Sequence, residues 1–144
     1  MILIGDTSGL VAALEVRHPD HEAARTVLAE AALTVVSPLV FLEIEHIVRR
    51  DFDSGVAGSV NDWLLTQEVS GRISVPALSS AHLIKARRVQ DRYADLQLDL
   101  TDAVSVVLAA EYETEDVLTL DHKDFRAVTP LTGAPAFRLL PADR

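Results

Sequence analysis

The sequence predicts an α/β domain in which helices cover both faces of a central parallel sheet. Short apolar segments of strand length alternate with longer segments of helical periodicity, and this alternation is typical of a parallel sheet. The chain has 144 residues, of which 49% are hydrophobic, so one core can bury most of the apolar surface. No repeat or linker interrupts the sequence. We therefore expect residues 1–144 to form a single domain.

The first half of the chain contains three of the expected strands and four of the expected helices. The strands are short runs of mainly apolar residues at Ile2–Ile4, Leu33–Val36 and Arg72–Val75. The helices show capping residues or apolar residues at helical spacing, at Ser8–Glu15, Asp20–Ala32, Pro38–Arg50 and Val56–Thr66. The third of them follows Ser37, a capping residue, and has a proline in its first position, which is a typical helix start.

The second half of the chain adds two long helices and two strands. The helices are expected at Ser79–Tyr93 and Leu100–Tyr112, and the strands at Asp116–Leu120 and Phe137–Leu140. Residues 103–110 carry no charge, so we expect the second of these helices to be largely buried.

The composition excludes several classes of protein. The chain has no cysteine, which excludes a disulfide framework, a thiolate zinc site, an iron–sulfur cluster and a cysteine nucleophile. No charge-free run approaches the ~20 apolar residues of a membrane helix, and the N-terminus MILIGD lacks the basic region of a secretory signal. We therefore expect a cytoplasmic protein without membrane contact. The formal charge of −9 repels polyanions at long range and attracts basic partners.

Two acidic residues are expected at the carboxyl end of the sheet, where parallel α/β folds bind their ligands. Asp6 follows the first expected strand directly, and Asp121 follows the fourth directly. Asp6 has a second interpretation, because an aspartate after a strand often does no more than cap the next helix. The two carboxylates nevertheless meet on one rim of the sheet.

Further acids lie at the starts or margins of the helices. Glu43 and Glu45 both border the apolar stripe of their helix, and periodicity does not choose between them, although a solvated margin is favoured for Glu45. Asp99 fits the role of a helix cap, whereas Asp102 lies beside small apolar residues and is expected at the sheet rim. Asp124 is either an acid that supports this site or an ordinary turn residue.

Carboxylates that converge in a folded protein repel one another, and burial adds a desolvation cost, so the group requires raised pKa values or a counter-cation. Oxygen-only ligands select a hard ion, and no histidine pair with a zinc spacing competes, so Mg²⁺ or Mn²⁺ is expected. Such an ion lowers the pKa of a bound water and shields charge on phosphorus, which indicates metal-assisted phosphodiester hydrolysis without a protein nucleophile.

The acidic segments resemble a known family. Four segments carry the likeness, namely Ile4-Gly5-Asp6-Thr7-Ser8-Gly9-Leu10, the Glu43 helix after Ser37-Pro38, Asp99-Leu100-Thr101-Asp102-Ala103 and Leu118-Thr119-Leu120-Asp121-His122-Lys123-Asp124-Phe125. In this order and spacing they resemble the four acidic motifs of PIN-domain nucleases. The small size of the chain makes it most similar to VapC-type toxins of bacterial toxin–antitoxin pairs.

The resemblance assigns roles to individual residues. It implies that the catalytic, metal-binding acids are Asp6, Glu43, Asp102 and Asp121. It places Thr7 or Ser8 near the metal site and makes Asp99 and Asp124 accessory.

The resemblance also implies a fold and partners. The fold is a three-layer PIN-like domain with about five parallel strands in the order 3-2-1-4-5. The activity is Mg²⁺-dependent endoribonuclease cleavage of RNA by the toxin of a type II pair. The expected partners are a second copy of the chain, in a homodimer, and a VapB-like antitoxin that blocks the site. Gly5 and Gly9 stand where such proteins more often have larger apolar residues, which predicts a slightly looser first helical turn.

Basic residues concentrate in two places, at Arg49-Arg50 and at Arg87-Arg88. Each arginine either contacts RNA phosphate or belongs to a solvated helix face, and the second interpretation is favoured for each. Trp63 is expected in the core or at a dimer contact, with an apolar slot for a partner segment as the alternative.

Two other functions are alternatives for this sequence. A phosphoryl-transfer protein of the receiver or phosphatase type also has an aspartate after its first strand. However, Ser8 occupies the second position of the Asp-x-Asp signature, and the third strand runs into Pro76 without an aspartate. A non-catalytic binding module of the same fold would have lost metal ligands, whereas this chain retains four candidates.

Overall fold

The computed structural model describes residues 1–52 and 54–144, and within them five parallel strands form one sheet in the order β3-β2-β1-β4-β5. The strands are β1 (Ile2–Gly5), β2 (Leu33–Val35), β3 (Ile73–Ser74), β4 (Asp116–Leu118) and β5 (Arg138–Leu140). The first strand of the chain lies at the centre, where Ile4 is in register with Val35 on one side and with Val117 on the other. The predicted fold class and strand order are confirmed.

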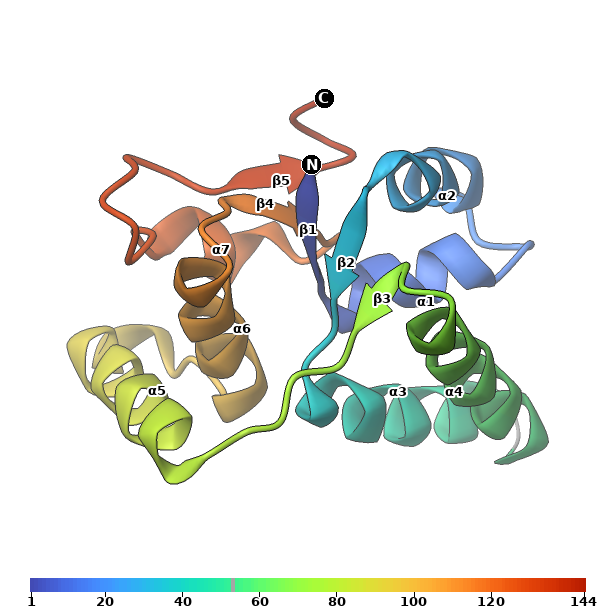
Figure 1. The fold of residues 1–144 in the computed structure, drawn as a ribbon, viewed down its shortest axis with the longest axis horizontal. Helices are drawn as coiled ribbons and strands as arrows, with labels where there is room; N and C mark the ends of the chain where they lie inside the picture. Colours follow the sequence, from blue (N-terminus) through green and yellow to red (C-terminus); the bar gives the residue numbers. More distant parts are fainter. Residues whose placement is uncertain (53) are drawn as a thin grey trace.

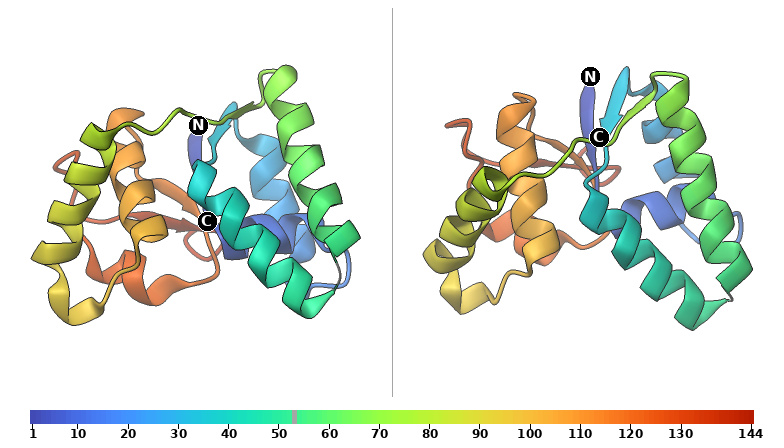
Figure 2. Two further views of the ribbon diagram at one scale, coloured as in Figure 1. Left: turned by 90° about the horizontal axis from the view of Figure 1, so that it is seen from below. Right: turned by 60° about the horizontal axis from the view of Figure 1, so that its bottom comes forward.

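Helices cover both faces of this sheet (Figure 1). One face carries α1 (Thr7–Leu14), α2 (His21–Glu30), α3 (Pro38–Asp51) and α4 (Ser54–Val69). The other face carries α5 (Ser80–Arg92), α6 (Leu100–Glu111) and α7 (His122–Ala127). Figure 2 shows the pair α3 and α4 on one side of the sheet and the pair α5 and α6 on the other. None of the helices in the described part of the chain is long and apolar enough to cross a bilayer.

Neighbouring residues of the central strands serve different cores. Leu3 packs among the side chains of α1–α4, whereas the adjacent Ile4 packs among those of α5–α7. Leu118 and Val117 divide in the same way on β4. Because successive side chains of a strand point to opposite faces, a sheet covered on both sides needs apolar residues at every position. This requirement explains why the strands are short, uninterrupted apolar runs.

Gly9 allows α1 to lie directly against the end of β4. A Cβ atom at this position would lie 2.4 Å from the carbonyl oxygen of Leu118, a distance that real Cβ atoms do not adopt. Gly5 is also tightly enclosed, since its Cβ would lie 3.0 Å from a methyl group of Leu10. The expectation of a looser first turn is therefore wrong. The two glycines bring the start of α1 closer to the sheet than larger residues would allow.

The segment after β4 departs most from the sequence prediction. The strand ends at Leu118 rather than Leu120, so Asp121 is separated from it by two residues. The backbone N–H of Thr119 still donates to the carbonyl of Leu140 at 3.1 Å. Beyond it, the backbone N–H groups of Leu120 and Asp121 donate to the hydroxyls of Ser8 and Thr119. The short helix α7 was not predicted, because its six residues, HKDFRA, contain too few apolar positions to show a helical period.

Candidate active site

Asp6 lies between β1 and α1, and its carboxylate is almost completely buried. The residue occupies the N-cap position of α1, but its side chain makes no capping hydrogen bond, so the simple capping interpretation does not hold. Its Oδ2 accepts hydrogen bonds from the hydroxyl of Thr119 at 2.7 Å and from that of Ser8 at 3.3 Å. Its Oδ1 is buried without any hydrogen-bond partner among the described residues.

Burial raises the pKa of Asp6 to about 6. Desolvation is the main cause and the negative charge of Glu43 adds to it, although the hydrogen bonds from Thr119, from the backbone of Thr7 and from Ser8 act in the opposite direction. A carboxylate with an unpartnered buried oxygen and an elevated pKa is unstable in its charged form unless a cation or proton donor approaches it.

Asp102 lies in the first turn of α6 and is also buried. Its pKa is raised to about 9, first by desolvation and then by the charges of nearby acids, namely Asp6, Asp99, Glu43 and Asp124. Four acids from separate segments therefore act on this one carboxylate. Asp99 also confirms its predicted role as a cap, because its Oδ1 accepts the backbone N–H of Asp102 at 2.8 Å.

The structure distinguishes the two glutamates of α3. Glu43 is half-buried and acts electrostatically on both Asp6 and Asp102. Glu45 instead pairs with Arg49 at 3.0 Å on the exposed side of the helix. Glu43 is thus the glutamate of the acidic cluster, and Glu45 belongs to a solvated face.

Asp124 acts on the cluster from α7, and Asp121, in the loop after β4, acts on Asp124. Asp121 is exposed and lies at the N-cap position of α7, where its side chain makes no capping bond. Asp124 is half-buried, and its pKa is raised by burial first and by the charge of Asp121 second. Asp124 also raises the pKa of Asp102, so it faces the cluster and is more than a turn residue.

Thr119 links the two ends of the site, a role that the sequence pattern did not predict. The residue is fully buried. Its hydroxyl donates to Oδ2 of Asp6 and accepts the backbone N–H of Asp121 at 3.0 Å. Beside it, Ser8 Oγ accepts the backbone N–H of Leu120 at 2.9 Å. The available signal was a threonine two residues before an aspartate, a position from which hydroxyls often bind loop N–H groups.

The residues present fit a hard divalent cation. Among the residues that the structure describes, no three acidic or histidine side chains are already spaced to hold a metal ion. The donors are nevertheless all oxygen atoms, one of them is buried without a partner, and two of the carboxyl groups have strongly raised pKa values. A cation among Asp6, Glu43 and Asp102 would remove the repulsion and satisfy that oxygen.

The arginines of the two basic segments lie on exposed helix faces. Arg49 pairs with Glu45, Arg50 with Asp51, and Arg87 with Asp91. Arg88 is exposed and has no ion-pair partner in the described part of the chain. All four therefore lie on solvated helix faces, and three of them are paired with acids.

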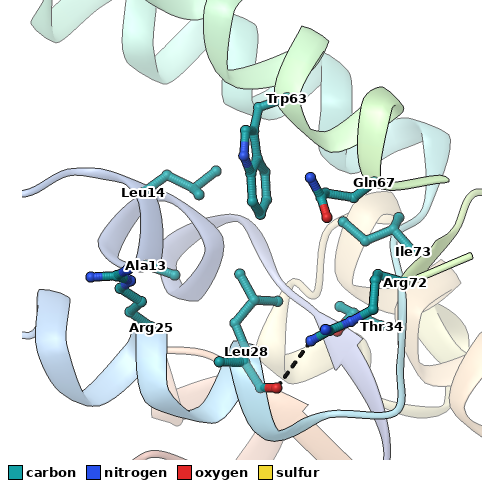
Figure 3. Close-up of a pocket in the computed structure, with 10 residues that line it drawn as sticks. Ala13, Leu14, Arg25, Leu28, Thr34, Trp63, Gln67, Arg72 and Ile73 are labelled. Atoms are coloured by element: carbon teal, nitrogen blue, oxygen red, sulfur yellow. Dashed lines mark hydrogen bonds between the residues drawn. The ribbon is translucent and has the colours of Figure 1, made fainter. Parts of the chain in front are cut away.

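Trp63 borders an open hollow of about 240 Å³ between α1, α2, α4 and β3 (Figure 3). The residue is 41% exposed, so it is not part of the core. Its ring points into the hollow, whose apolar wall includes Leu14, Leu28 and Ile73. Arg72, at the edge, donates a hydrogen bond to the carbonyl of Ala29. The hollow has the character of the apolar slot that was the alternative interpretation of Trp63.

Known proteins share this fold and sequence. A family model of the PIN domain matches residues 3–129. The chain is 32% identical over 142 residues to Ribonuclease VapC26 of Mycobacterium tuberculosis. The matched region covers 96% of this chain and 100% of that protein.

Two solved structures show the same fold at lower identity. The sarcin–ricin loop cleaving toxin VapC20 of M. tuberculosis is 18% identical, with a TM-score of 0.74 over 87% of this chain and 93% of that one. VapBC2 of Rickettsia felis, bound to a promoter DNA fragment, is 19% identical, with a TM-score of 0.58 over 78% of this chain and 83% of that one. From the family match and the relative with 32% identity, the chain belongs to the PIN domain family and is of the VapC type.

Proposed function

We propose that this chain is a metal-dependent endoribonuclease and the toxin of a type II toxin–antitoxin pair. The observation that carries the proposal is the pair of buried carboxyl groups at the carboxyl end of the sheet, Asp6 and Asp102, which no cationic side chain of the described residues compensates. The name of the relative VapC26, a ribonuclease, supports RNA as the substrate. Mg²⁺ is the proposed ion and Mn²⁺ its substitute, because both prefer oxygen ligands.

The side chains divide the work of this site. Asp6, Glu43 and Asp102 would hold the ion, and Asp121 would complete the set from the loop after β4. When bound, the ion lowers the pKa of a water molecule and neutralises charge that develops on the phosphate. Thr119 and Ser8 hold Asp6 through its Oδ2, which leaves Oδ1 available. Asp99 holds the first turn of α6, on which Asp102 lies.

An antitoxin is the second proposed partner. VapBC2 and a toxin–antitoxin complex from Klebsiella pneumoniae share the fold. The Klebsiella structure is 17% identical to this chain, with a TM-score of 0.58 over 89% of this chain and 97% of that one. The apolar hollow beside Trp63 offers a docking surface for an apolar antitoxin segment. The net charge of −9 favours a basic antitoxin at long range, whereas the charged residues that line the hollow are Arg25 and Arg72. We propose that the toxin works in the cytoplasm as a homodimer.

The nuclease proposal is tested with the purified chain and single-stranded or loop-containing RNA. We expect cleavage with Mg²⁺ or Mn²⁺, no cleavage in EDTA, and no cleavage by the Asp6→Asn variant. Full activity of that variant would show that the acidic cluster is not the active site. Metal-independent RNA binding without cleavage by the unmodified chain would instead indicate a non-catalytic module.

The antitoxin proposal is tested by expressing the chain together with the reading frame next to its gene. We expect a small basic protein to co-purify with it and to inhibit RNA cleavage. Recovery of the chain alone from this co-expression contradicts the toxin assignment and leaves the nuclease proposal standing.

A further inference from the structure

A groove of about 440 Å³ opens beside the acidic cluster, between α1, the C-terminal end of α3 and the loop after β4. Three of the residues that line it belong to the candidate active site, namely Thr7, Ser8 and Asp121. Any ligand that fills the groove therefore lies next to the position of a scissile phosphate. This inference rests on the proposed nuclease function and concerns what else of the RNA the site recognises.

The walls of the groove suit a flat apolar ring. They are formed mainly by Val11, Ile47, Leu120 and Phe52. The first three are half-buried, whereas Phe52, which caps the C-terminus of α3, is 49% exposed. An aromatic side chain that remains half in solvent beside a nuclease site can stack on an unpaired base.

The acidic residues that line the groove carry negative charge and accept hydrogen bonds, and neither lysine nor arginine is among the described lining residues. Glu15 and Asp51 line it together with Asp121 and His18. Glu15 uses Oε1 to accept the backbone N–H of Arg17 at 2.9 Å, and its Oε2 has no partner among the described residues. Carboxylates repel phosphate but accept hydrogen bonds from the amino and imino groups of bases. The groove therefore excludes the RNA backbone and favours a base.

The buried hydroxyl of Thr7 is a second indication of a ligand at the boundary between groove and cluster. Thr7 is 1% exposed, and its Oγ1 has no hydrogen-bond partner in the described part of the chain. Buried hydroxyl groups are almost always paired, so an unpaired one in the wall of a groove points to a polar group that is supplied from outside. A ribose hydroxyl next to the scissile phosphate has this chemistry.

We propose that this groove is a nucleobase subsite, in which a base adjacent to the scissile bond stacks on Phe52 and presents its hydrogen-bond donors to Glu15. Guanine fits best, because its imino and amino groups are adjacent donors on one edge. Cytosine and adenine offer an amino group alone, and uracil offers one imino group. The subsite thus gives the nuclease a preference for guanine beside the cut.

Cleavage of a randomised RNA pool, followed by sequencing of the product ends, tests the subsite. We expect guanine to be enriched on one side of the cut by the unmodified chain. Phe52→Leu should raise KM for a guanine-containing substrate about tenfold with little change in kcat, because one base stack is lost. Phe52→Tyr should retain the preference, and Glu15→Gln should weaken the selection of guanine.

Ile84→Ala is the control, because Ile84 is exposed to a similar degree, at 53%, but lies on α5, which covers the other face of the sheet. It should leave KM and base preference unchanged. If Phe52→Leu and Glu15→Gln also cleave with unchanged KM and preference, the subsite is wrong while the nuclease function stands. If Phe52→Leu loses only affinity for the co-expressed partner protein, the groove is a protein docking surface and the subsite is likewise wrong.

Binding is measured separately from cleavage, on the Asp102→Asn variant with RNA trinucleotides that differ only in the central base, by NMR titration. Chemical-shift changes of residues around Phe52 that appear only with guanine support the subsite. They do so even if the unmodified chain cleaves no RNA, because that result overturns only the nuclease proposal. Equal or absent shifts for all four bases overturn the subsite.

Discussion

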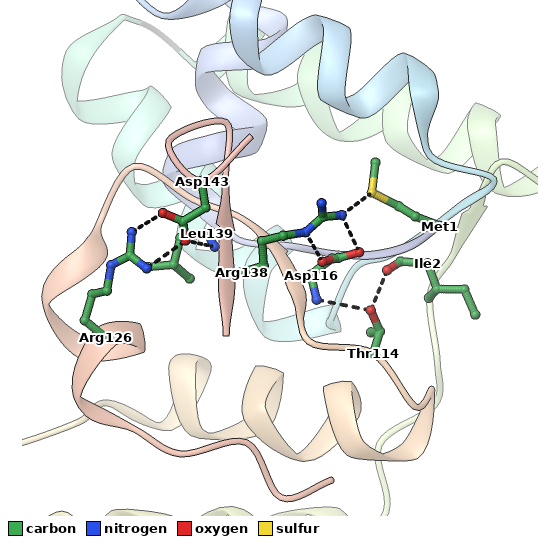
Figure 4. A network of polar contacts seen from close by, with 8 residues as sticks. All are labelled: Met1, Ile2, Thr114, Asp116, Arg126, Arg138, Leu139 and Asp143. Carbon is green, nitrogen blue, oxygen red and sulfur yellow. Dashed lines mark hydrogen bonds and ion pairs between the residues drawn. The ribbon is translucent and has the colours of Figure 1, made fainter. Parts of the chain in front are cut away.

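The two ends of the parallel sheet hold their acidic residues in opposite environments. At the carboxyl end, Asp6 and Asp102 are buried near other acids, and their pKa values rise to about 6 and about 9. At the amino end, Asp116 begins β4 and accepts two hydrogen bonds from Arg138 of β5, at 2.6 Å and 3.0 Å (Figure 4). Arginine therefore neutralises Asp116 at the amino end of the sheet, whereas the described residues supply no cation to Asp6 and Asp102 at the carboxyl end. The carboxyl end is thus the one that requires an external cation.

A fourth acid, Asp143, shows what full neutralisation does. Asp143 accepts hydrogen bonds from Arg126 and from the backbone N–H of Leu139, and these contacts lower its pKa to about 2 (Figure 4). The same side-chain type thus spans the range from a strongly acidic group to one that is protonated at neutral pH. Position in the fold, and not residue type, decides which aspartates hold the structure and which serve the site.

The sharpest test exchanges one acid at each end of the sheet. Asp102→Asn should lower RNA cleavage by more than about a hundredfold, because a metal ligand is lost. In the absence of metal it should raise the melting temperature by about 3 °C or more, because Asp102 must take up a proton to be buried beside other acids and asparagine needs none. Cleavage assays and thermal melts in EDTA measure the two effects.

Asp116→Asn is the paired control. It leaves Arg138 without its carboxylate, so it should lower the melting temperature slightly and leave cleavage unchanged. Should both variants change activity and stability in the same direction, the contrast between the two ends does not hold.

A second test concerns the hydroxyl that orients Asp6. Thr119→Val keeps the shape of the side chain but removes the hydrogen bonds to Oδ2 of Asp6 and from the N–H of Asp121. We expect cleavage to fall about 10- to 100-fold, as for other residues that position metal ligands. We also expect a smaller stabilisation by added Mg²⁺ in thermal melts. Thr119→Ser should restore both, and equal behaviour of the two variants would assign Thr119 to packing alone.

The third test is the pH dependence of stability without metal. The folded pKa values of Asp6 and Asp102 lie above the ordinary value of 3.8, so the native state binds more protons than the unfolded state between about pH 4 and pH 9. The free energy of unfolding should therefore fall by about 2 kcal/mol or more from pH 5 to pH 8. Denaturant titrations in EDTA measure it, and Mg²⁺ should flatten the trend. Stability that rises over this range contradicts the uncompensated cluster.

Much of the fold was predictable because apolar strands and helical periods alternate clearly in this sequence. The strand order came from the family resemblance, since periodicity cannot say which strands are neighbours. The end of β4 was not predictable because Thr119 and Leu120 form hydrogen bonds with Asp6 and Ser8, which are far away in the sequence. The helix α7 was not predictable because its six residues show no helical period.

The acidic residues were predictable from their positions, but their environments were not. Periodicity alone could not separate Glu43 from Glu45, and the choice of Glu43 came from the family resemblance. In the structure Glu45 pairs with Arg49, one turn away. It also could not identify Thr119, whose contacts with Asp6 join residues 113 positions apart. Burial and long-range hydrogen bonds arise only when the sheet is assembled.

The central place of β1 has a consequence for synthesis on the ribosome. The first strand to emerge pairs with β2 at once, but its other edge stays open until β4 is made, more than a hundred residues later. Asp102 and Asp121 leave the ribosome in the same late stretch as β4. A half-translated chain thus has neither a finished sheet nor a full set of acids. An enzyme that cleaves RNA is therefore inactive while it is still bound to the ribosome.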